Sequence, residues 1–343
     1  MFAFDWPRAY GQPPVTGVLR QSPADFFVEE RLGFEPDGKG EHCWLWVEKE
    51  NLNTADAAQR IARFSGLRES DISYSGLKDK RAVTRQWFCV HLLNREVDWS
   101  QWSDPALRIL RVERHSKKLR RGTHRSNYFE ILLREVQGDI DALRERVEQI
   151  RTNGVPNYFG EQRFGRDGRT FELAKRAALQ QSRLSRQQAS LYFSALRSYL
   201  FNEVLAHRIA KNNWNTPLAG EVFMLNRSNS VFVQTLDAAL LERFDSHDIH
   251  LTGPMPGADG TIVPAGEVQQ IEQAVLREHG VLVSYLASAK VESARRSFRL
   301  IPDDLCLEPI DDGTWRLTFT LGRGCFATSL MRELVDYSVS VME

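Results

Sequence analysis

The sequence predicts an α+β protein in which a sheet-rich domain is interrupted by an insertion and completed by the C-terminal segment. Three changes of character along the chain predict this. Short β-branched and aromatic runs recur between residues 17 and 134, helical periodicity dominates 170–211, and strand character returns at 314–321. A length of 343 residues suffices for one large domain or two of ordinary size.

The first elements are strands and one helix. The runs VLRQSPADFFVEERL and HCWLWVEKE predict strands within 17–49, separated by the turn-rich EPDGKGE. Asn53 can cap the helix that follows, with Asp56 three residues on. The expected core face of this helix consists of Ala57, Ile61, Ala62 and Phe64. Residues 71–93 predict a strand, the loop SGLKDKRAVTR and the stronger strand QWFCVHLL.

Later elements alternate between strand and helix. Strands are predicted at 107–112 and 127–134, and an amphipathic helix through Ile140, Leu143, Val147 and Ile150, which Gly154 and Pro156 should stop. The apolar positions within 170–211, which we interpret as ordinary core, are Leu191, Leu196, Leu200, Val204 and Leu205. Residues 253–267 predict a long loop, and a final helix should begin near Cys325.

The composition is that of a soluble globular protein, with 42% hydrophobic and 26% charged residues. No apolar run approaches the roughly 18 residues of a membrane span, and MFAFDWPRAYG lacks the features of a secretory signal. We therefore expect a cytoplasmic protein with no membrane association. The four cysteines and eight histidines lie too far apart in sequence for a disulfide framework or a metal site. Motifs for a nucleotide cofactor, GxxxxGK[ST] and GxGxxG, are missing from the sequence.

Two segments concentrate charge. Residues 108–125 hold eight Lys or Arg against the single acid Glu113, which fits a polyanion site or, equally, a solvated surface turn. In GLKDKRAVTRQ, residues 76–86, Asp79 lies between Lys78 and Lys80 in a loop between two predicted strands. Neighbouring cations favour an ionised carboxylate, which suits a nucleophile. By itself this pattern is more often a solvated turn of mixed charge.

GLKDKRAVTRQ resembles the G-x-K-D-x-x-A-x-T-x-Q segment of the TruD family of tRNA pseudouridine synthases. Further segments resemble that family in the same order along nearly the whole chain. They are SPADFFVEE at 22–30, GKGEHCWLWVEK at 38–49 with Asn53-Thr54 after it, SNYFEILLRE at 126–135, GVPNYFGEQRFG at 154–165, ESARR at 292–296 and GCFATSLMREL at 324–334.

The resemblance implies a fold, a reaction and a set of residues. The fold would be a mixed, largely antiparallel sheet domain of the pseudouridine-synthase type, formed by 1–152 and 302–343, with a second α/β domain, the TRUD domain, inserted at 153–301. The reaction would convert uridine 13 in the D-arm of tRNA to pseudouridine, with tRNA bound by a monomer. The implied residues are Asp79 as catalytic carboxylate, and Arg20, Lys78, Asn127 and Phe129 at the substrate.

The chemistry agrees with these roles. Pseudouridine forms when the N-glycosidic bond breaks, the uracil rotates and a carbon–carbon bond replaces it, so we expect no cofactor and no metal. A buried carboxylate could attack the ribose or abstract a sugar proton, and the residues leave both routes open. The target base must leave the stack, so Phe129 could be its platform, or an ordinary core residue. Arg20 stands where we would expect lysine at least as often, which keeps the charge but changes the geometry of the contact.

Other contacts and other functions remain open. In GVPNYFGEQRFG, rings and polar groups suit RNA, although a packed hinge is equally compatible; the candidates are Asn157, Phe159, Arg163 and Phe164. For the RNA backbone we expect Lys117, Lys118, Arg120 and Arg121. The alternatives are a glycoside or nucleoside hydrolase that uses Asp79 with Glu29 or Glu30, and a non-catalytic RNA-binding protein.

Overall fold

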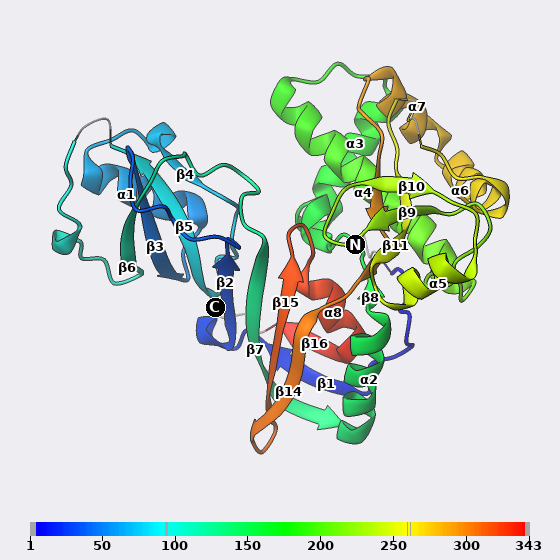
Figure 1. The fold of residues 1–343 in the computed structure, drawn as a ribbon, viewed down its shortest axis with the longest axis horizontal. Helices are drawn as coiled ribbons and strands as arrows, with labels where there is room; N and C mark the ends of the chain where they lie inside the picture. The colour runs from blue at the N-terminus through cyan, green and yellow to red at the C-terminus, as the bar shows by residue number, and fades with distance from the viewer. Residues whose placement is uncertain (1–4, 93–94, 259, 261, 340–343) are drawn as a thin grey trace. The chain divides into compact units, whose positions relative to one another are not determined.

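The computed structural model describes residues 5–92, 95–258, 260 and 262–339 (Figure 1). Several predictions extend outside the described residues: the first four residues of the N-terminal segment, residue 93 of the strand predicted up to that point, residues 259 and 261 of the predicted loop, and residues 340–343 of the C-terminal part. No helix in the described part of the chain is both long and apolar enough to cross a membrane.

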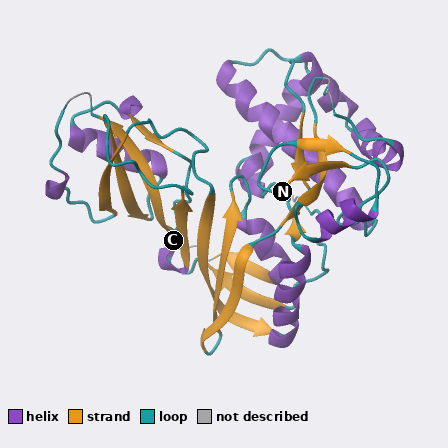
Figure 2. Ribbon diagram, viewed as in Figure 1, coloured by secondary structure: helices purple, strands orange, loops and turns teal. Residues whose placement is uncertain are grey.

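The chain forms two compact units. The first, here called the sheet unit, contains Pro13–Arg151, Pro302–Cys325 and the described residues from Leu334 on. The second, the helical unit, contains Thr152–Ile301 together with Phe326–Glu333 and the described residues up to Gln12. Contacts therefore place part of the N-terminal and C-terminal segments with residues 152–301. Strands dominate the first unit and helices the second (Figure 2).

A large sheet organises the sheet unit. Its main path runs β14 (Asp303–Asp311), β15 (Thr314–Gly322), β7 (Ser126–Gly138), β2 (Phe26–Arg31), β5 (Val83–His91), β3 (His42–Glu50) and β6 (Leu107–His115). β1 (Val15–Leu19), β16 (Val335–Val339) and β4 (Ile72–Tyr74) pair at its sides. Among the described strands of this sheet, β2 with β5 and β1 with β16 are parallel, and the other pairs are antiparallel. This confirms the predicted mixed, largely antiparallel α+β fold.

The described part of the sheet unit includes the helices α1 (Thr54–Ser65) and α2 (Ile140–Asn153). α1 packs on the face of β3 and β5 that carries Leu45 and Val47, and its own Ala57, Ile61 and Ala62 are buried there as predicted. α2 buries Leu143, Val147 and Ile150, and it is followed directly by Gly154, whose φ is 74°.

Two details of the predicted first helix are wrong. Phe64 is 38% exposed and packs on Trp99 and Trp102 instead of joining the buried face. Asn53 occupies the capping position, but its side chain caps no backbone N–H; it donates instead to the Asp56 carboxylate at 3.0 Å. The acceptor is charged, which makes this hydrogen bond stronger than one to a neutral group.

The helical unit packs helices against a small sheet. The helices are α3 (Arg169–Leu179), α4 (Arg186–Ala210), α5 (Ala238–Asp245), α6 (Gly266–Glu278), α7 (Gly280–Ser288) and α8 (Ala327–Leu334). The sheet runs β10 (Val231–Val233), β9 (Val222–Leu225), β11 (Ile249–Met255) and β12 (Ala294–Ser297), and its described pairs are antiparallel. A short pair joins β8 (Val155–Pro156) to β13 (Arg299–Leu300).

Two further predictions are corrected, and one strand was not predicted. Leu191 is 54% exposed, whereas Leu196, Leu200, Val204 and Leu205 lie in the core as predicted. The predicted loop is shorter, because β11 continues to Met255 by pairing with β12, and α6 already begins at Gly266. The final helix begins two residues after Cys325 as expected, but the strand β16 that follows it was not predicted.

Candidate active site

An interruption between two strands builds one side of the candidate site. β1 and β2 run along the same side of β7: Leu19 lies opposite Leu133, and Phe26 opposite Ile131. Residues 20–25 therefore form a bulge between β1 and β2, and a single residue of β7, Leu132, lies across from the whole bulge. The Pro23–Asp25 turn closes this bulge, since the Ser22 N–H donates to Asp25 at 2.7 Å and Arg134 binds the same carboxylate. The sequence signal is the SPAD turn inside an otherwise strand-like run.

Arg20 begins the bulge and leaves the sheet. Its φ of 56° is a left-handed conformation that a residue with a side chain adopts rarely. The guanidinium lies 3.9 Å from the centroid of the Phe26 ring, and Nη2 donates to Oδ2 of Asp79 at 2.5 Å. The structure thus brings Arg20 and Asp79 together, although they are far apart in sequence.

Buried hydrogen bonds from Gln86 and Thr54 hold the loop that carries Asp79. The Gln86 side chain donates to the Gly76 carbonyl at 3.1 Å and accepts from Thr54 at 3.1 Å. The Thr54 hydroxyl also accepts the backbone N–H of Lys78 at 2.9 Å. Gln86 and Thr54 are both buried, so these bonds fix the loop without water. The sequence motif contains Gln86, but its bracing role was not predicted.

Lys49 is the most important residue that the sequence analysis missed. It is fully buried, and its ammonium group donates to the main-chain carbonyl of Asp79 at 2.8 Å. Burial lowers the pKa of Lys49 to about 8, against the attraction of Asp79. A signal was present: Lys49 continues the inward-facing series of Leu45 and Val47, where a lysine is out of place unless it has a buried partner.

A buried ion pair lies beside this loop. The Lys78 ammonium is 3.0 Å from Oε2 of Glu30, and both side chains are almost inaccessible. The Glu30 carboxylate also accepts the backbone N–H of Trp87 at 3.3 Å, and burial raises its pKa against the opposing effect of Lys78. Glu29 is paired with Arg85 at 3.4 Å. Lys78 thus points inward, and the two glutamates considered for a hydrolase are already engaged.

Asn127 and Phe129 lie on one face of β7, as alternation along a strand requires. Asn127 is opposite Glu30 and Leu321, and its side-chain oxygen is buried and accepts no hydrogen bond from any described residue. Phe129 is only 8% exposed. Its ring stacks on Phe319, with centroids 5.0 Å apart, and lies edge-on to Phe26. Phe129 is therefore largely covered by other rings in this structure.

Asp79 itself is not buried, contrary to the expectation of a buried carboxylate. Its side chain is 47% exposed, with one oxygen held by Arg20. Keeping a charged group in contact with water avoids the cost of desolvating it, which the single bond to Arg20 would not fully offset. Among the described residues, no group of His, Cys, Asp and Glu side chains has the arrangement of a metal site.

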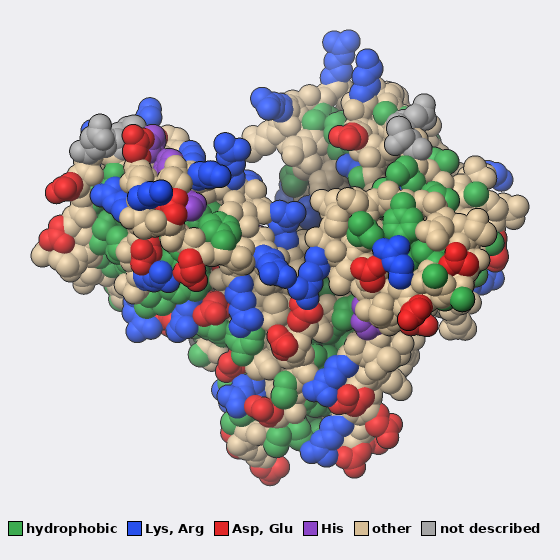
Figure 3. Space-filling model, viewed as in Figure 1, with side chains coloured by type: hydrophobic (Ala, Val, Ile, Leu, Met, Phe, Trp, Pro, Cys, Tyr) green, Lys and Arg blue, Asp and Glu red, His purple; other side chains and the backbone are tan. Residues whose placement is uncertain are grey.

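A loop rich in cations adjoins the Asp79 loop. This basic loop, residues 116–125, is fixed by Ser75, whose carbonyl accepts the Gly122 N–H at 2.7 Å and whose hydroxyl accepts the His124 N–H at 2.8 Å. The four predicted backbone-binding residues are exposed, and none of them forms an ion pair within the described chain: Lys117, Lys118, Arg120 and Arg121. Over the visible face of the sheet unit, Figure 3 shows Lys and Arg side chains interspersed with Asp and Glu.

The candidates in GVPNYFGEQRFG lie mostly inside the helical unit. Phe164 is fully buried, and Phe159 is 6% exposed beneath the Arg296 guanidinium, 4.0 Å from its ring centroid. The Asn157 side chain is buried and binds the Ser297 carbonyl at 3.0 Å. Direct contact between RNA and these three side chains would require the segment to open.

Arg163 differs from its neighbours because it is only partly buried. It donates to the Ser194 hydroxyl at 3.0 Å and lines a cavity of about 170 Å³ with Gln162, Leu191 and Phe326. This cavity explains why Leu191 is exposed, since it stands at the edge of the opening. Burial lowers the pKa of the Arg163 guanidinium, which nevertheless stays charged.

Comparisons with known proteins cover almost the entire chain. The family model described as tRNA pseudouridine synthase D (TruD) matches residues 8–179 and 172–334. The tRNA pseudouridine synthase D of Methylococcus capsulatus is 41% identical over 336 residues, 97% of this chain and 95% of that one. The enzyme of the same name from Ectopseudomonas mendocina is 43% identical over 332 residues, 96% and 94% of the two chains.

A solved structure is similar in fold. The crystal structure of the TruD protein of Methanosarcina mazei superposes with a TM-score of 0.71 at 20% identity, covering 96% of this chain and 95% of that one. The family model and the relatives both match nearly the full length, and the fold agrees with them. The chain therefore belongs to the TruD family of tRNA pseudouridine synthases.

Proposed function

We propose that this chain isomerises uridine 13 in the D-arm of tRNA to pseudouridine, with Asp79 as the catalytic carboxylate. The Arg20–Asp79 pair carries the proposal. A carboxylate that is 47% exposed can reach a substrate, and the 2.5 Å contact with Arg20 keeps it oriented. Family membership supports the reaction class, and the match of GLKDKRAVTRQ to the family motif supports the choice of Asp79.

The reaction asks little of the protein beyond position and charge. The bond from the ribose to N1 of uracil breaks, a bond from the ribose to C5 forms, C5 loses a proton and N1 gains one. Asp79 either attacks the ribose or removes a sugar proton, and both routes need an ionised, accessible carboxylate. Lys49 holds the main chain of Asp79, and Arg20 holds its side chain, so the carboxylate meets the ribose in a fixed orientation.

Asn127 is the proposed contact to the base. A buried amide oxygen without a partner is costly, and the N–H at position 3 of uracil could supply the missing hydrogen bond. Phe129 would support the site from below, through its edge contact with Phe26. Lys78 would act through Glu30, whose Cα lies opposite that of Asn127 in the sheet, and not by touching the substrate directly.

The basic loop is proposed to hold the RNA backbone. Its four exposed cations, Lys117, Lys118, Arg120 and Arg121, are available to phosphates, and Ser75 ties the loop to the segment that leads into Asp79. Because tRNA is found in the cytoplasm, we propose that the chain acts there, as a monomer. A measured mass in solution near twice the 39.4 kDa of the chain would contradict the monomer.

The test is incubation with unmodified tRNA, followed by pseudouridine mapping at nucleotide resolution. The protein is first dialysed against a strong chelator, and no cofactor is added. We expect complete conversion at position 13 and nowhere else. Release of free uracil would indicate a hydrolase, and binding without chemical change would indicate a non-catalytic RNA-binding protein. Activity that returns only with one divalent ion, while the tRNA stays folded, would contradict the metal-free reaction.

A further inference from the structure

A concave surface lies in the sheet unit, on the face of β3 and β5 opposite α1. Leu45 and Val47 of β3 face the helix, so Trp44 and Trp46 face the other way. Trp87 of β5 joins them, with ring centroids 5.2 Å from Trp46 and 5.9 Å from Trp44. Trp44 and Trp87 are buried, whereas Trp46 is only partly covered.

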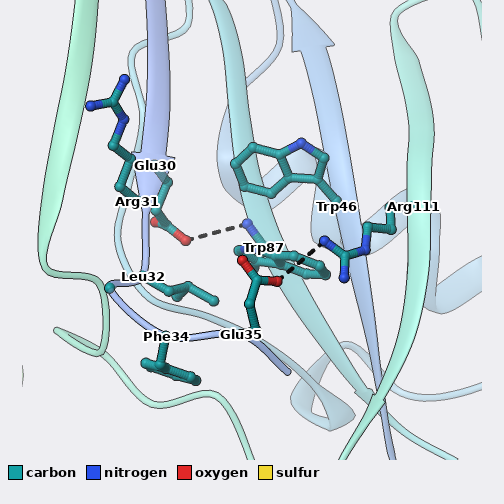
Figure 4. Close-up of a pocket in the computed structure, with 9 residues that line it drawn as sticks. Glu30, Arg31, Leu32, Phe34, Glu35, Trp46, Trp87 and Arg111 are labelled. Carbon is teal, nitrogen blue, oxygen red and sulfur yellow. Dashed lines mark hydrogen bonds and ion pairs between the residues drawn. The ribbon is translucent and has the colours of Figure 1, made fainter. Parts of the chain in front are cut away.

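The partly covered tryptophan borders a cavity of about 460 Å³. Figure 4 shows Trp46 and Trp87 side by side, with Arg111 reaching toward Trp87 and Glu35. The Arg111 guanidinium lies 5.9 Å from the Trp87 ring centroid and 3.3 Å from the Glu35 carboxylate. Phe34, which is 44% exposed, lines the same cavity. Cavities of this size bind small ligands or single groups of larger ones.

These side chains suit a flat heteroaromatic group with hydrogen-bond donors on its edge. The indole of Trp46 offers a ring face for stacking, and Arg111 adds a planar cation beside it. Glu35 is 79% exposed, and its carboxylate can accept hydrogen bonds but not donate them. A nucleobase with an exocyclic amino group combines the required ring and donors. Uracil has no amino group.

The surroundings supply what a nucleotide requires besides its base. Leu119 of the basic loop is buried in the same cluster as Trp44, Trp46 and Trp87. The Trp44 indole N–H also donates to the Lys117 carbonyl at 3.2 Å. The exposed cations of the basic loop are therefore anchored to the tryptophans, which allows phosphate and base to be bound together.

The cavity shares one residue, Glu30, with the surroundings of the candidate active site, but it is a different site. Glu30 and Trp87 belong to its lining, and Glu30 is the carboxylate that pairs with Lys78, the residue before Asp79. Neither Asp79 nor Arg20 lines the cavity.

We propose that this cavity receives an unstacked, amino-bearing base of the tRNA, distinct from the target uridine. The proposal rests on the proposed function, because it takes tRNA as the substrate. A second captured base would help to select one uridine among many, since one uridine alone carries too little information.

The first experiment compares three variants for tRNA affinity, single-turnover rate and melting temperature. Trp46→Leu should weaken binding of unmodified tRNA about 5- to 150-fold, the range for loss of one base–aromatic stack. Trp46→Phe keeps a ring and should stay within a few-fold of wild type. The matched control is Trp99→Leu, which removes another partly buried tryptophan, on the α1 side of the sheet, and should not change affinity.

The second experiment identifies the base. Abasic nucleotides are placed one at a time in unpaired positions of the tRNA. One position should weaken binding to wild type but cause no further loss with Trp46→Leu, as expected when both changes remove one contact. Wild-type affinity in a stable Trp46→Leu variant, or full additivity at every position, would overturn the proposal. Either result leaves the proposed function intact if wild type still forms pseudouridine, whereas an inactive wild type would overturn that function instead.

Discussion

The Asp79 loop and the 154–165 segment are the two most distinctive stretches of the sequence, and the structure uses them in opposite ways. In the loop, buried Gln86 and Lys49 bind main-chain carbonyls, and the charged side chain of Asp79 stays 47% exposed. In the segment, Phe159 and Phe164 turn inward and are at most 6% exposed.

The difference follows from the chemistry of the side chains. A carboxylate gains from hydration and must be held by its surroundings if it is to act on a substrate. A phenylalanine gains roughly 1.5–3 kcal/mol from burial, so a ring becomes a surface platform only where packing leaves it no room inside. A sequence motif of aromatic and amide side chains therefore does not distinguish an RNA-binding surface from a core. A charged side chain on a loop that buried hydrogen bonds hold in place indicates a functional site.

The largest expected effect comes from Asp79→Asn. Loss of the charge at constant shape should lower the single-turnover rate on the order of 10⁴-fold or more, with tRNA affinity unchanged. Asp141→Asn, which alters a carboxylate that is 86% exposed on α2, should have no effect. A nearly normal rate in the Asp79 variant would contradict the proposal that Asp79 is the catalytic carboxylate.

Phe164→Ala tests whether the buried rings of the 154–165 segment stabilise the fold instead of binding RNA. Removing a fully buried ring should lower the free energy of unfolding by about 3–5 kcal/mol, measured by denaturant titration. Activity per folded molecule should not change. Leu179→Ala, at a residue 62% exposed on α3, should cost little. If Phe164→Ala were stable but bound tRNA poorly, the segment would be an RNA surface after all.

Lys49→Met sharpens the account of the bracing and has a pH signature. Below about pH 8, the pKa of Lys49 in the folded chain, the ammonium group is charged in both the folded and the unfolded chain. The cost of burying that charge is then fully present. From pH 8 toward the ordinary 10.5, the folded chain releases the proton first, so wild-type stability should rise relative to Lys49→Met by up to about 3 kcal/mol. Denaturant titrations across this range measure the difference. Parallel curves would mean that Lys49 does not titrate there.

Replacement of Lys117, Lys118, Arg120 and Arg121 by alanine tests whether the Asp79 region extends into the basic loop. tRNA binding should weaken and depend less on salt, by up to roughly 0.7–0.9 in log–log slope per lost phosphate contact. The control removes Arg68 and Arg144, exposed arginines already paired with carboxylates. An unchanged slope would make the loop an ordinary solvated surface.

The smallest effect is expected from Arg163→Ala. Arg163 is the only one of the four candidates in its segment that is partly exposed, and it borders the cavity of about 170 Å³. The apparent Michaelis constant for tRNA should rise a few-fold, by more than the saturating single-turnover rate falls. A lower melting temperature with a proportional loss of activity would mean that Arg163, like the buried Phe159 and Phe164, only stabilises the fold.

Local patterns predicted the elements better than they predicted exposure. The strand in HCWLWVEKE and the buried positions Ala57, Ile61 and Ala62 of α1 were predicted from local patterns, and the structure confirms them. Periodicity puts Lys49 on the inward face with Leu45 and Val47, but it could not identify the partner, a carbonyl 30 residues later in the chain. It also could not show that Phe129 would be covered by Phe319, or that β16 would pair with β1. Such contacts depend on segments far away in the sequence.

The pairing of β1 with β16 has a consequence during synthesis on the ribosome. Val15 lies opposite Val335, so β1 meets this neighbour only after nearly all of the intervening chain has been translated. Until then one edge of β1 is open, directly before the residue that holds Asp79. An open edge invites pairing with other chains. The nascent protein should therefore need a chaperone most between translation of β7 and translation of β16, and should become active only when the late strand arrives.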